Sequence, residues 1–380
     1  MTWTFDEIKG SWLNGGQIAL TAEAIVEAFE RTEQVLGRDW IEQSRLVAGN
    51  PTHGADPVLK VFAMGRRLAS IDGVAGADVL TRKLSQKDDS AEAELTAIYL
   101  LRSRGNVEIE LSPPVIVGKR ERQPDLRIRQ PRESWTYVEV TKPDVSEVYR
   151  RAAKVLERLS WLLGMTDESY VLEVFLRREP NDLETEQIAK QIRSLDRTRT
   201  AFTSELAAGF GLVFLNHSLP GEQVFKRQRG EVDLPRLSAF TIRVETLDGI
   251  PARIVVSIPF ADERAEQFLE SEAKQLPKEC PGLVMVEMAQ VWIGFRSWVP
   301  LLRRRFQPMI HTRVGAVCLF STSAMPTHED GQLKLTWLPH TKVLANPYAR
   351  NRLPSWITEV LEEAGADARK IMGGSPGGDD

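Results

Sequence analysis

Two acidic residues in the central part of the chain occupy positions from which their carboxylates could act together. Asp125 begins a short apolar run, and Glu139 interrupts the next run along the chain. Because side chains alternate along a strand, Val138 and Val140 share one face and Glu139 points to the other. If the two strands are neighbours, both carboxylates face one cleft. Two hard oxygen donors in that arrangement predict a site for Mg²⁺ or Mn²⁺, which could organise water for attack on a phosphodiester.

A third carboxylate, that of Glu94, lies on a predicted helix from Ser90 to Arg104. Ile98 and Leu101 follow it at the fourth and seventh positions, so Glu94 shares their apolar face. A buried carboxylate without a partner is costly in free energy. If this face packs on the sheet, Glu94 is expected to reach the same metal as the two strand carboxylates.

The elements that must position these acids follow a simple order of helix, three strands and helix. The first helix ends before Gly105, and turn or charged residues separate the three apolar runs. After the helix described above, the predicted elements are the strands Val107 to Leu111, Pro124 to Ile128 and Tyr137 to Val140, and the helix Glu147 to Leu163. We expect the three strands to be adjacent in one sheet, with both helices packed against it.

The pattern Glu94, then Pro124-Asp125, then Glu139-Val140-Thr141-Lys142 resembles the PD-(D/E)XK nuclease superfamily. The resemblance extends from about residue 89 to residue 164. It implies an α/β (α+β) fold with a restriction endonuclease-like αβββα core, and metal-dependent hydrolysis of phosphodiester bonds in nucleic acid. It also implies that Asp125 and Glu139 are metal ligands and that Glu94 is an auxiliary ligand.

The chain departs from the family pattern where the family has a lysine, because Thr141 occupies that position. Lys142 is the first candidate to replace it, since a bulge before Pro143 could turn its side chain toward Glu139. Lys154, on the next helix, is the second. Two hypotheses follow: a metal-dependent nuclease, or a nuclease fold that has lost catalysis and serves as a nucleic-acid-binding or protein-binding regulatory module.

Basic residues gather around the predicted strands and allow two interpretations. They could contact the phosphates of a nucleic acid, with DNA favoured over RNA, or they could form a solvated loop and an outer sheet face. These residues are Lys119, Arg120, Arg122, Arg127 and Arg129.

The rest of the chain predicts flanking regions without a recognisable catalytic motif. Residues 1–88 read as helices, from Thr21 to Gly37, from Pro57 onward, and from Ala77 to Gln86. Residues 89–180 form the nuclease-like core, residues 181–371 a mixed α/β region, and residues 372–380 a disordered tail. The mixed region is predicted to contain a long helix from Leu183 to Ala208. Either flanking region could bind a partner protein.

Composition limits the class of protein. The chain has 380 residues, a net charge of -4 and 42% hydrophobic residues, which suits a globular protein of two or three domains. Its two cysteines, Cys280 and Cys318, are far apart and predict neither a disulfide framework nor a zinc site. We find no secretion signal and no apolar run long enough for a membrane helix. These features favour a cytoplasmic protein without membrane association.

Overall fold

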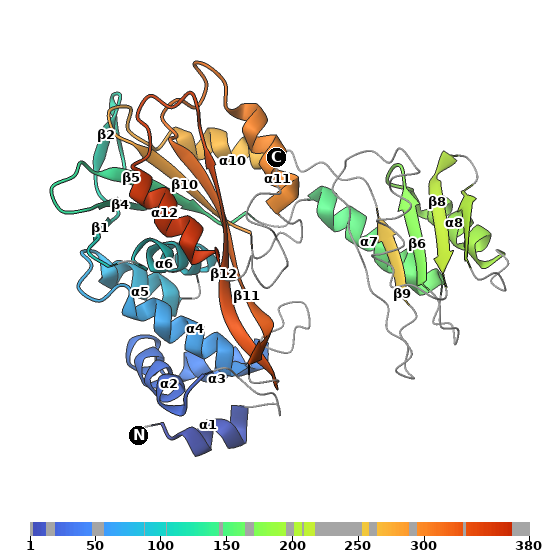
Figure 1. Ribbon diagram of the computed structural model, residues 1–380, viewed down its shortest axis with the longest axis horizontal. Coiled ribbons are helices and arrows are strands. Elements are labelled where there is room, and N and C mark those ends of the chain that lie inside the picture. Colours follow the sequence, from blue (N-terminus) through green and yellow to red (C-terminus); the bar gives the residue numbers. More distant parts are fainter. Residues whose placement is uncertain are drawn as a thin grey trace. The chain divides into compact units, whose positions relative to one another are not determined.

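The computed structural model describes residues 3–12, 20–47, 57–86, 88–103, 105–143, 147–163, 171–194, 201–206, 209–216, 253–257, 264–288, 295–329 and 332–366. The fold is mixed α/β, as expected, and the chain divides into two compact units (Figure 1). Unit 1 comprises residues 1–143, 266–290 and 301–380, and unit 2 comprises residues 144–265 and 291–300. The region predicted as the nuclease-like core therefore contributes to both units.

Unit 1 is built on a six-stranded mixed sheet. Its strands, in spatial order, are β1 (Glu108–Leu111), β4 (Leu126–Arg129), β5 (Thr136–Thr141), β10 (Gly282–Glu287), β11 (Ala316–Glu329) and β12 (Gln332–Ala345). The pairs β1–β4, β4–β5 and β11–β12 are antiparallel, whereas β5–β10 and β10–β11 are parallel. The adjacency predicted for the first three strands is confirmed. The insertion of β10 beside β5 brings together segments far apart in the sequence.

Several helices of unit 1 follow the predicted apolar spacing, whereas α1, α3 and α12, whose bounds are given next, were not predicted. Those described are α1 (Phe5–Trp12), α2 (Ala22–Leu36), α3 (Arg38–Val47), α4 (Pro57–Ala69), α5 (Ala77–Ser85), α6 (Asp89–Leu101), α10 (Arg264–Ala273) and α12 (Ser355–Ala364), while α11 (Phe295–Arg305) spans the boundary between the units. The hydroxyl of Thr21 accepts from the Ala24 N–H and caps α2, as expected. Helix α12 follows the last predicted strand, in a segment for which the sequence predicted no element.

The cap of α6 differs from the prediction. Asp88, rather than Ser90, is the N-cap, because its carboxylate accepts hydrogen bonds from both the main-chain N–H and the hydroxyl of Ser90. The helix also ends earlier than predicted, at Leu101, with Arg102 rather than Gly105 at its C-cap. Glu94 lies near its middle.

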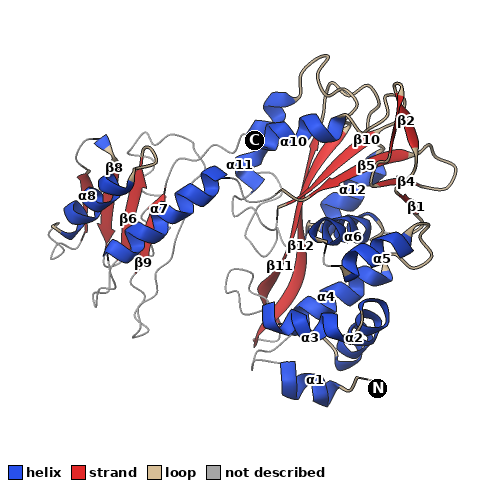
Figure 2. Cartoon of the chain, turned by 180° about the vertical axis from the view of Figure 1, so that it is seen from behind, coloured by secondary structure: helices blue, strands red, loops and turns tan. Residues whose placement is uncertain are grey.

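One face of the six-stranded sheet is buried beneath α6 and α12. Val138, Val140, Leu283 and Met285 belong to the same buried cluster as the apolar residues of these helices (Figure 2). Side chains at the alternate positions of β5, among them Glu139, point to the opposite face. The carboxylate of Glu139 therefore lies outside the main apolar core.

A separate two-stranded antiparallel hairpin, β2 (Val115–Val117) and β3 (Arg120–Arg122), connects β1 to β4. The sequence predicted only a turn and a charged cluster here. Gly118, in the connection, has φ of 68°, a conformation that suits glycine.

Unit 2 contains a four-stranded sheet with two described helices. Its strands, in spatial order, are β7 (Ala201–Glu205), β8 (Gly211–Asn216), β6 (Val171–Leu176) and β9 (Arg253–Ser257), and the helices are α7 (Glu147–Leu163) and α8 (Asp182–Arg193). The prediction of one long helix from Leu183 to Ala208 is wrong, since α8 ends at Arg193 and β7 begins at Ala201. Helix α7, expected to pack on the nuclease-like sheet, belongs to this unit and packs against α8.

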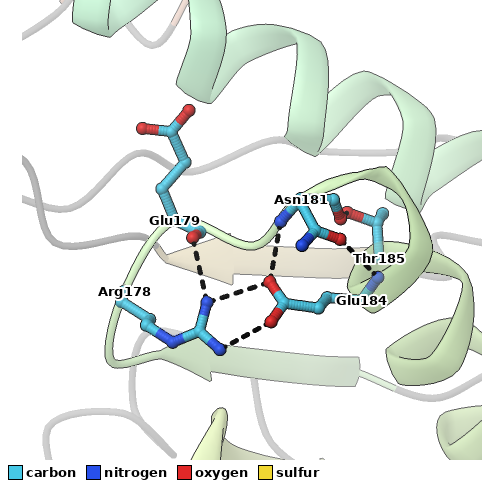
Figure 3. A network of polar contacts seen from close by, with 5 residues as sticks. All are labelled: Arg178, Glu179, Asn181, Glu184 and Thr185. Atoms are coloured by element: carbon cyan, nitrogen blue, oxygen red, sulfur yellow. Dashed lines mark hydrogen bonds and ion pairs between the residues drawn. The ribbon is translucent and has the colours of Figure 1, made fainter.

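A polar network fixes the start of α8 (Figure 3). Asn181 and Glu184 form a capping box, in which each side chain accepts a hydrogen bond of 2.9 Å from the main chain of the other. Arg178 donates to both carboxylate oxygens of Glu184, and this hydrogen bonding lowers the pKa of Glu184 to about 2. Two predicted features, the Asp248-Gly249 hairpin turn and the tail 372–380, lie outside the described residues.

Candidate functional site

Asp125 and Glu139 come together where β4 begins. The last recorded pair between β4 and β5 is Leu126 with Val138, and one further step in the same antiparallel register places Asp125 opposite Glu139. The main-chain N–H of Val140 donates to Oδ2 of Asp125 at 2.7 Å. This bond holds the Asp125 carboxylate against β5. The sequence prediction that these two acids occupy adjacent strands is therefore met.

Glu139 is almost completely buried, with an exposed fraction of 2%. Burial, the charges of Asp125 and Glu272, and a hydrogen bond with Asp125 together raise the pKa of Glu139 to about 10, with burial the largest cause. Its Oε1 atom has no hydrogen-bond partner among the described residues. A buried carboxylate oxygen without a partner is energetically costly and rare. Glu139 is therefore protonated at neutral pH unless a cation offsets the surrounding negative charge.

The pKa of Asp125, the other member of the pair, is also raised. Burial raises the pKa of Asp125, while the Val140 N–H, the Glu139 side chain and the charge of Lys83 act in the opposite direction. The hydrogen bond between the two side chains raises the pKa of Glu139 and lowers that of Asp125. A proton on Glu139 that is donated to the Asp125 carboxylate accounts for both effects. The two acids thus share a proton as a coupled pair.

Glu94 lies close enough to this pair to be affected by it. The pKa of Glu94 is raised to about 7, because burial and the charge of Asp125 outweigh the opposing effect of Lys83. The Lys83 ammonium lies 3.1 Å from Oε1 of Glu94. Glu94 is thus a buried acid whose partner is Lys83 of α5. The sequence patterns did not identify this lysine.

Sequence reasoning missed two charged residues of this site. Lys83 approaches from α5, in a region interpreted as having no catalytic residues, and Glu272 approaches from α10. Burial raises the pKa of Glu272, and the charge of Asp125 adds to the rise. No local pattern could have found either residue, because each is a half-buried side chain of a short polar helix and reaches the acids only through the tertiary fold.

The predicted lysines do not join the acids. Thr141 ends β5 in regular register with Val286 of β10, so the expected bulge is absent from the paired part of β5. Lys142 forms an ion pair of 3.6 Å with Glu287, at the end of β10. Lys154 is exposed on α7, in unit 2. Neither lysine therefore occupies the position that the family pattern assigns to that residue.

Lys142 belongs instead to a second buried polar cluster. Burial raises the pKa of Glu287, while the charges of Lys142 and Arg67 oppose this rise. Arg67, itself buried, donates to the hydroxyl of Thr96 on α6 at 2.7 Å. The cluster lies on the α4 and α6 side of the sheet, where alternation along β5 directs residue 142. Its ion pair links the ends of two neighbouring parallel strands.

The five basic residues near the strands separate into two groups. Arg127 and Arg129 form ion pairs with Glu110 and Glu108, and both guanidinium groups lie over the ring of Trp135, at 4.4 and 4.2 Å from its centroid. The charges of these two arginines are therefore balanced by glutamates of β1, and their side chains stabilise the β1–β4 surface. The other group, Lys119, Arg120 and Arg122, lies on the β2–β3 hairpin, and no ion pair joins these three to any described residue.

The donor chemistry of the pair suits a hard divalent cation. Mg²⁺ is commonly held by one or two carboxylates with water completing its shell, and the orphaned Oε1 of Glu139 is a buried oxygen that a cation would satisfy. Among the described residues, however, no three His, Cys, Asp or Glu side chains are grouped so as to hold a metal ion. Glu94 and Glu272 therefore contribute charge, and the pair Asp125 and Glu139 provides the donor atoms.

Searches against protein-family models, curated proteins and solved structures gave no significant match. In the described part of the chain, no helix has the length and apolar character needed to cross a membrane.

Proposed function

We propose that this protein is a metal-dependent nuclease-like hydrolase of nucleic-acid phosphodiester bonds, with Mg²⁺ or Mn²⁺ held by Asp125 and Glu139. The proposal includes a restriction endonuclease-like core formed by α6, β1, β4 and β5. One observation carries it: a buried, hydrogen-bonded carboxyl pair whose Glu139 Oε1 has no partner. Burial of this pair destabilises the fold, and strongly shifted pKa values of this kind are typical of functional sites.

Each charged residue has a defined part in this proposal. The Val140 N–H orients the Asp125 carboxylate, so the donor pair is in place before any ligand arrives. A bound Mg²⁺ or Mn²⁺ would polarise a phosphate oxygen and make water a better nucleophile. Glu94 and Glu272 add negative charge, which strengthens cation binding and favours release of the proton shared by the pair.

Lys83 is the cation that the fold offers in place of a lysine at position 141. Its ammonium forms an ion pair with Glu94, and its charge opposes the rise in the pKa of Asp125. It is partly exposed, with a side-chain exposed fraction of 37%, so an incoming phosphate can reach it. A cation held beside a phosphate stabilises the negative charge that develops during cleavage.

The second hypothesis, a nuclease fold that binds nucleic acid or protein without cleaving, is favoured by Thr141 and by the absence of a three-residue ligand group among the described side chains. Calorimetry with Mg²⁺ and Mn²⁺ and cleavage assays on single- and double-stranded DNA and RNA distinguish the two. We expect metal binding and cleavage that Asp125→Asn abolishes. Metal-independent behaviour, with nucleic-acid or protein binding retained, would favour the inactive module.

Within the same assay, Lys83→Ala is expected to slow cleavage by on the order of 10² with little effect on substrate affinity. Lys83→Arg should recover part of the rate because it keeps the charge. The matched control is Arg82→Ala, which removes an exposed charge from the neighbouring position of α5. Equal rates for Lys83→Ala and Arg82→Ala would exclude Lys83 from the mechanism.

A further inference from the structure

Helix α7 of unit 2 carries a line of four exposed side chains. Arg150, Lys154, Glu157 and Trp161 follow one another at intervals of four, three and four positions, so they lie in one row along the helix. All four are exposed. Leu159, which is completely buried, lies on the opposite face of the helix. The row, called the α7 stripe below, is therefore the outward face of α7 within unit 2.

Ion pairs beside the stripe hold α7 in place. Arg151 pairs with Glu179 at 3.4 Å, and Arg158 pairs with Asp182 of α8 at 3.3 Å and also with Glu186. These arginines lie between the stripe and the side of α7 that packs on α8. The stripe is thus presented on a helix whose orientation in unit 2 is fixed by its neighbours.

The stripe ends in a tryptophan that the fold leaves in water. Trp161 is 79% exposed, and Leu183, on the neighbouring helix α8, is 71% exposed. Tryptophan has a large apolar surface and is enriched among the residues that dominate the affinity of protein interfaces. Within the described part of the chain, no ion pair engages Lys154 or Glu157. Both the apolar and the charged side chains of the stripe are therefore available to a partner.

The stripe is complementary to a second copy of itself. Let two copies of α7 pack antiparallel, with a two-fold axis passing between positions 154 and 157. Lys154 then lies opposite Glu157 of the partner subunit, and Arg150 lies opposite Trp161 of the partner subunit. The symmetry makes each contact twice. Lysine and glutamate attract one another, and a guanidinium over an indole ring forms a favourable cation–π contact.

Orientation is selected by the same charges. If the two helices packed parallel and in register, each lysine would face a lysine and each glutamate a glutamate. Like charges placed opposite one another across an interface are strongly unfavourable. Only the antiparallel arrangement pairs every charge of the stripe with a group that attracts it.

We infer that unit 2 is a homodimerisation unit, in which the α7 stripes of two copies pack antiparallel about a two-fold axis. This inference goes beyond the proposed function and depends on unit 2 alone. A two-fold interface that uses the same surface on both subunits is the commonest arrangement among homo-oligomers. Because one pair of short helices buries less surface than a standard interface, the dimer is weak and forms reversibly at micromolar concentrations.

Sedimentation velocity of the full chain, at protein concentrations from about 1 to about 300 µM, measures the dissociation constant of such a dimer. The variants are Lys154→Glu, Glu157→Lys, the double variant Lys154→Glu/Glu157→Lys, and Trp161→Ala. The matched control is Lys190→Glu, which reverses the charge of an exposed lysine on α8. Circular dichroism and urea unfolding verify that all variants are folded.

We expect the wild type, the control and the double variant to dimerise with similar dissociation constants. Lys154→Glu and Glu157→Lys should each dimerise at least about tenfold more weakly, because each variant places two pairs of like charges opposite one another. Trp161→Ala should weaken the dimer by a similar factor, since its side chain is lost from both subunits. An equimolar mixture of Lys154→Glu and Glu157→Lys should recover wild-type affinity, because a mixed dimer restores both attractive pairs.

A wild type that stays monomeric over the whole concentration range would overturn the inference and leave the stripe to a partner of different sequence. Association of Lys154→Glu as strong as that of Lys190→Glu would place any dimer interface elsewhere. If the mixture of the two single variants associated no better than either alone, the antiparallel pairing of positions 154 and 157 would be wrong.

Discussion

At the scale of single residues, Glu139 shows how a fold can oppose the ionisation of its own side chains. Its carboxylate is buried, and Asp125, Glu272 and Glu94 add like charge around it. Either influence alone would raise its pKa, and together they keep it protonated at neutral pH. The stability of the metal-free protein must therefore depend on pH.

We expect the free energy of unfolding, measured in EDTA, to fall as pH rises from 5 to 9. The pKa of Glu139 is raised from 4.5 to about 10 in the folded protein, so within this window the folded state holds a proton that the unfolded state has released. Glu94, with a pKa of about 7, adds to the fall in the lower part of the window. Stability from these groups is complete below pH 4.5 and is lost as pH rises.

Glu139→Gln should remove most of this pH dependence and stabilise the metal-free protein at pH 8 by on the order of 1–3 kcal/mol. Urea unfolding at pH 5 and pH 9 measures the effect. Glu121→Gln, which changes an exposed carboxylate on β3, is the control. Parallel pH profiles for the wild type and Glu139→Gln would show that Glu139 ionises normally.

Lys142 illustrates how one position along a strand changes the role of a side chain. Its ion pair with Glu287 is buried, with side-chain exposed fractions of 11% and 6%. Removing one partner leaves an uncompensated buried charge, so Lys142→Met should destabilise the protein by about 3–5 kcal/mol. Lys142→Met/Glu287→Gln should recover much of that loss, as measured by urea unfolding.

A catalytic role for Lys142 predicts the opposite result. If the lysine acted on the substrate, Lys142→Met would slow cleavage while leaving the free energy of unfolding nearly unchanged. Measurement of both quantities on the same variant decides between a structural and a catalytic role.

At the scale of elements, close packing between α2 and α4 supports the helical layer from which α5 and α6 present Lys83 and Glu94. A Cβ atom at Gly65 would lie 2.5 Å from the main-chain oxygen of Ala28. The two helices can approach this closely only because position 65 has no side chain. Gly65 is thus required by contact between helices rather than by its own backbone conformation.

Gly65→Ala should destabilise the protein by about 1–3 kcal/mol, because the two helices must move apart. Arg66→Ala, at the exposed neighbouring position, should change stability by no more than about 0.5 kcal/mol. Thermal and urea unfolding measure both. A neutral or stabilising effect of Gly65→Ala would mean that α2 and α4 do not cross at this glycine.

At the scale of the whole molecule, the chain forms unit 1, leaves it after residue 143, builds most of unit 2, and returns at residue 266. Each unit has its own sheet and its own buried residues. The acid pair, Lys83 and the basic hairpin all belong to unit 1. Metal binding should therefore be coupled to the folding of unit 1 alone.

Differential scanning calorimetry should show two transitions. Millimolar Mg²⁺ or Mn²⁺ should raise only the transition of unit 1, whereas Ile188→Ala, which creates a cavity beneath α8, should lower only that of unit 2. One transition that responds to both changes would show that the two units unfold together.

Local sequence patterns were sufficient to predict the strands β1, β4 and β5, their adjacency, the helix that carries Glu94, and the meeting of Asp125 with Glu139. Alternation, caps and short connections act over a few residues, so they can be identified without knowledge of the rest of the fold. Regular alternation along β5 directs Lys142 away from Glu139, and Lys142 does pair with Glu287 instead. The bulge proposed to turn it back toward Glu139 is absent from the paired part of β5.

The tertiary structure alone decided which charges surround the acid pair. Lys83 reaches Glu94 from α5, Glu272 reaches the pair from α10, and Glu287 captures Lys142 because β10, more than a hundred residues further along the chain, lies beside β5. No local rule specifies such a pairing, since the order of parallel strands depends on how distant segments bury their apolar faces together. The same physics explains why the sequence could place the carboxylates but not the cations that act on them.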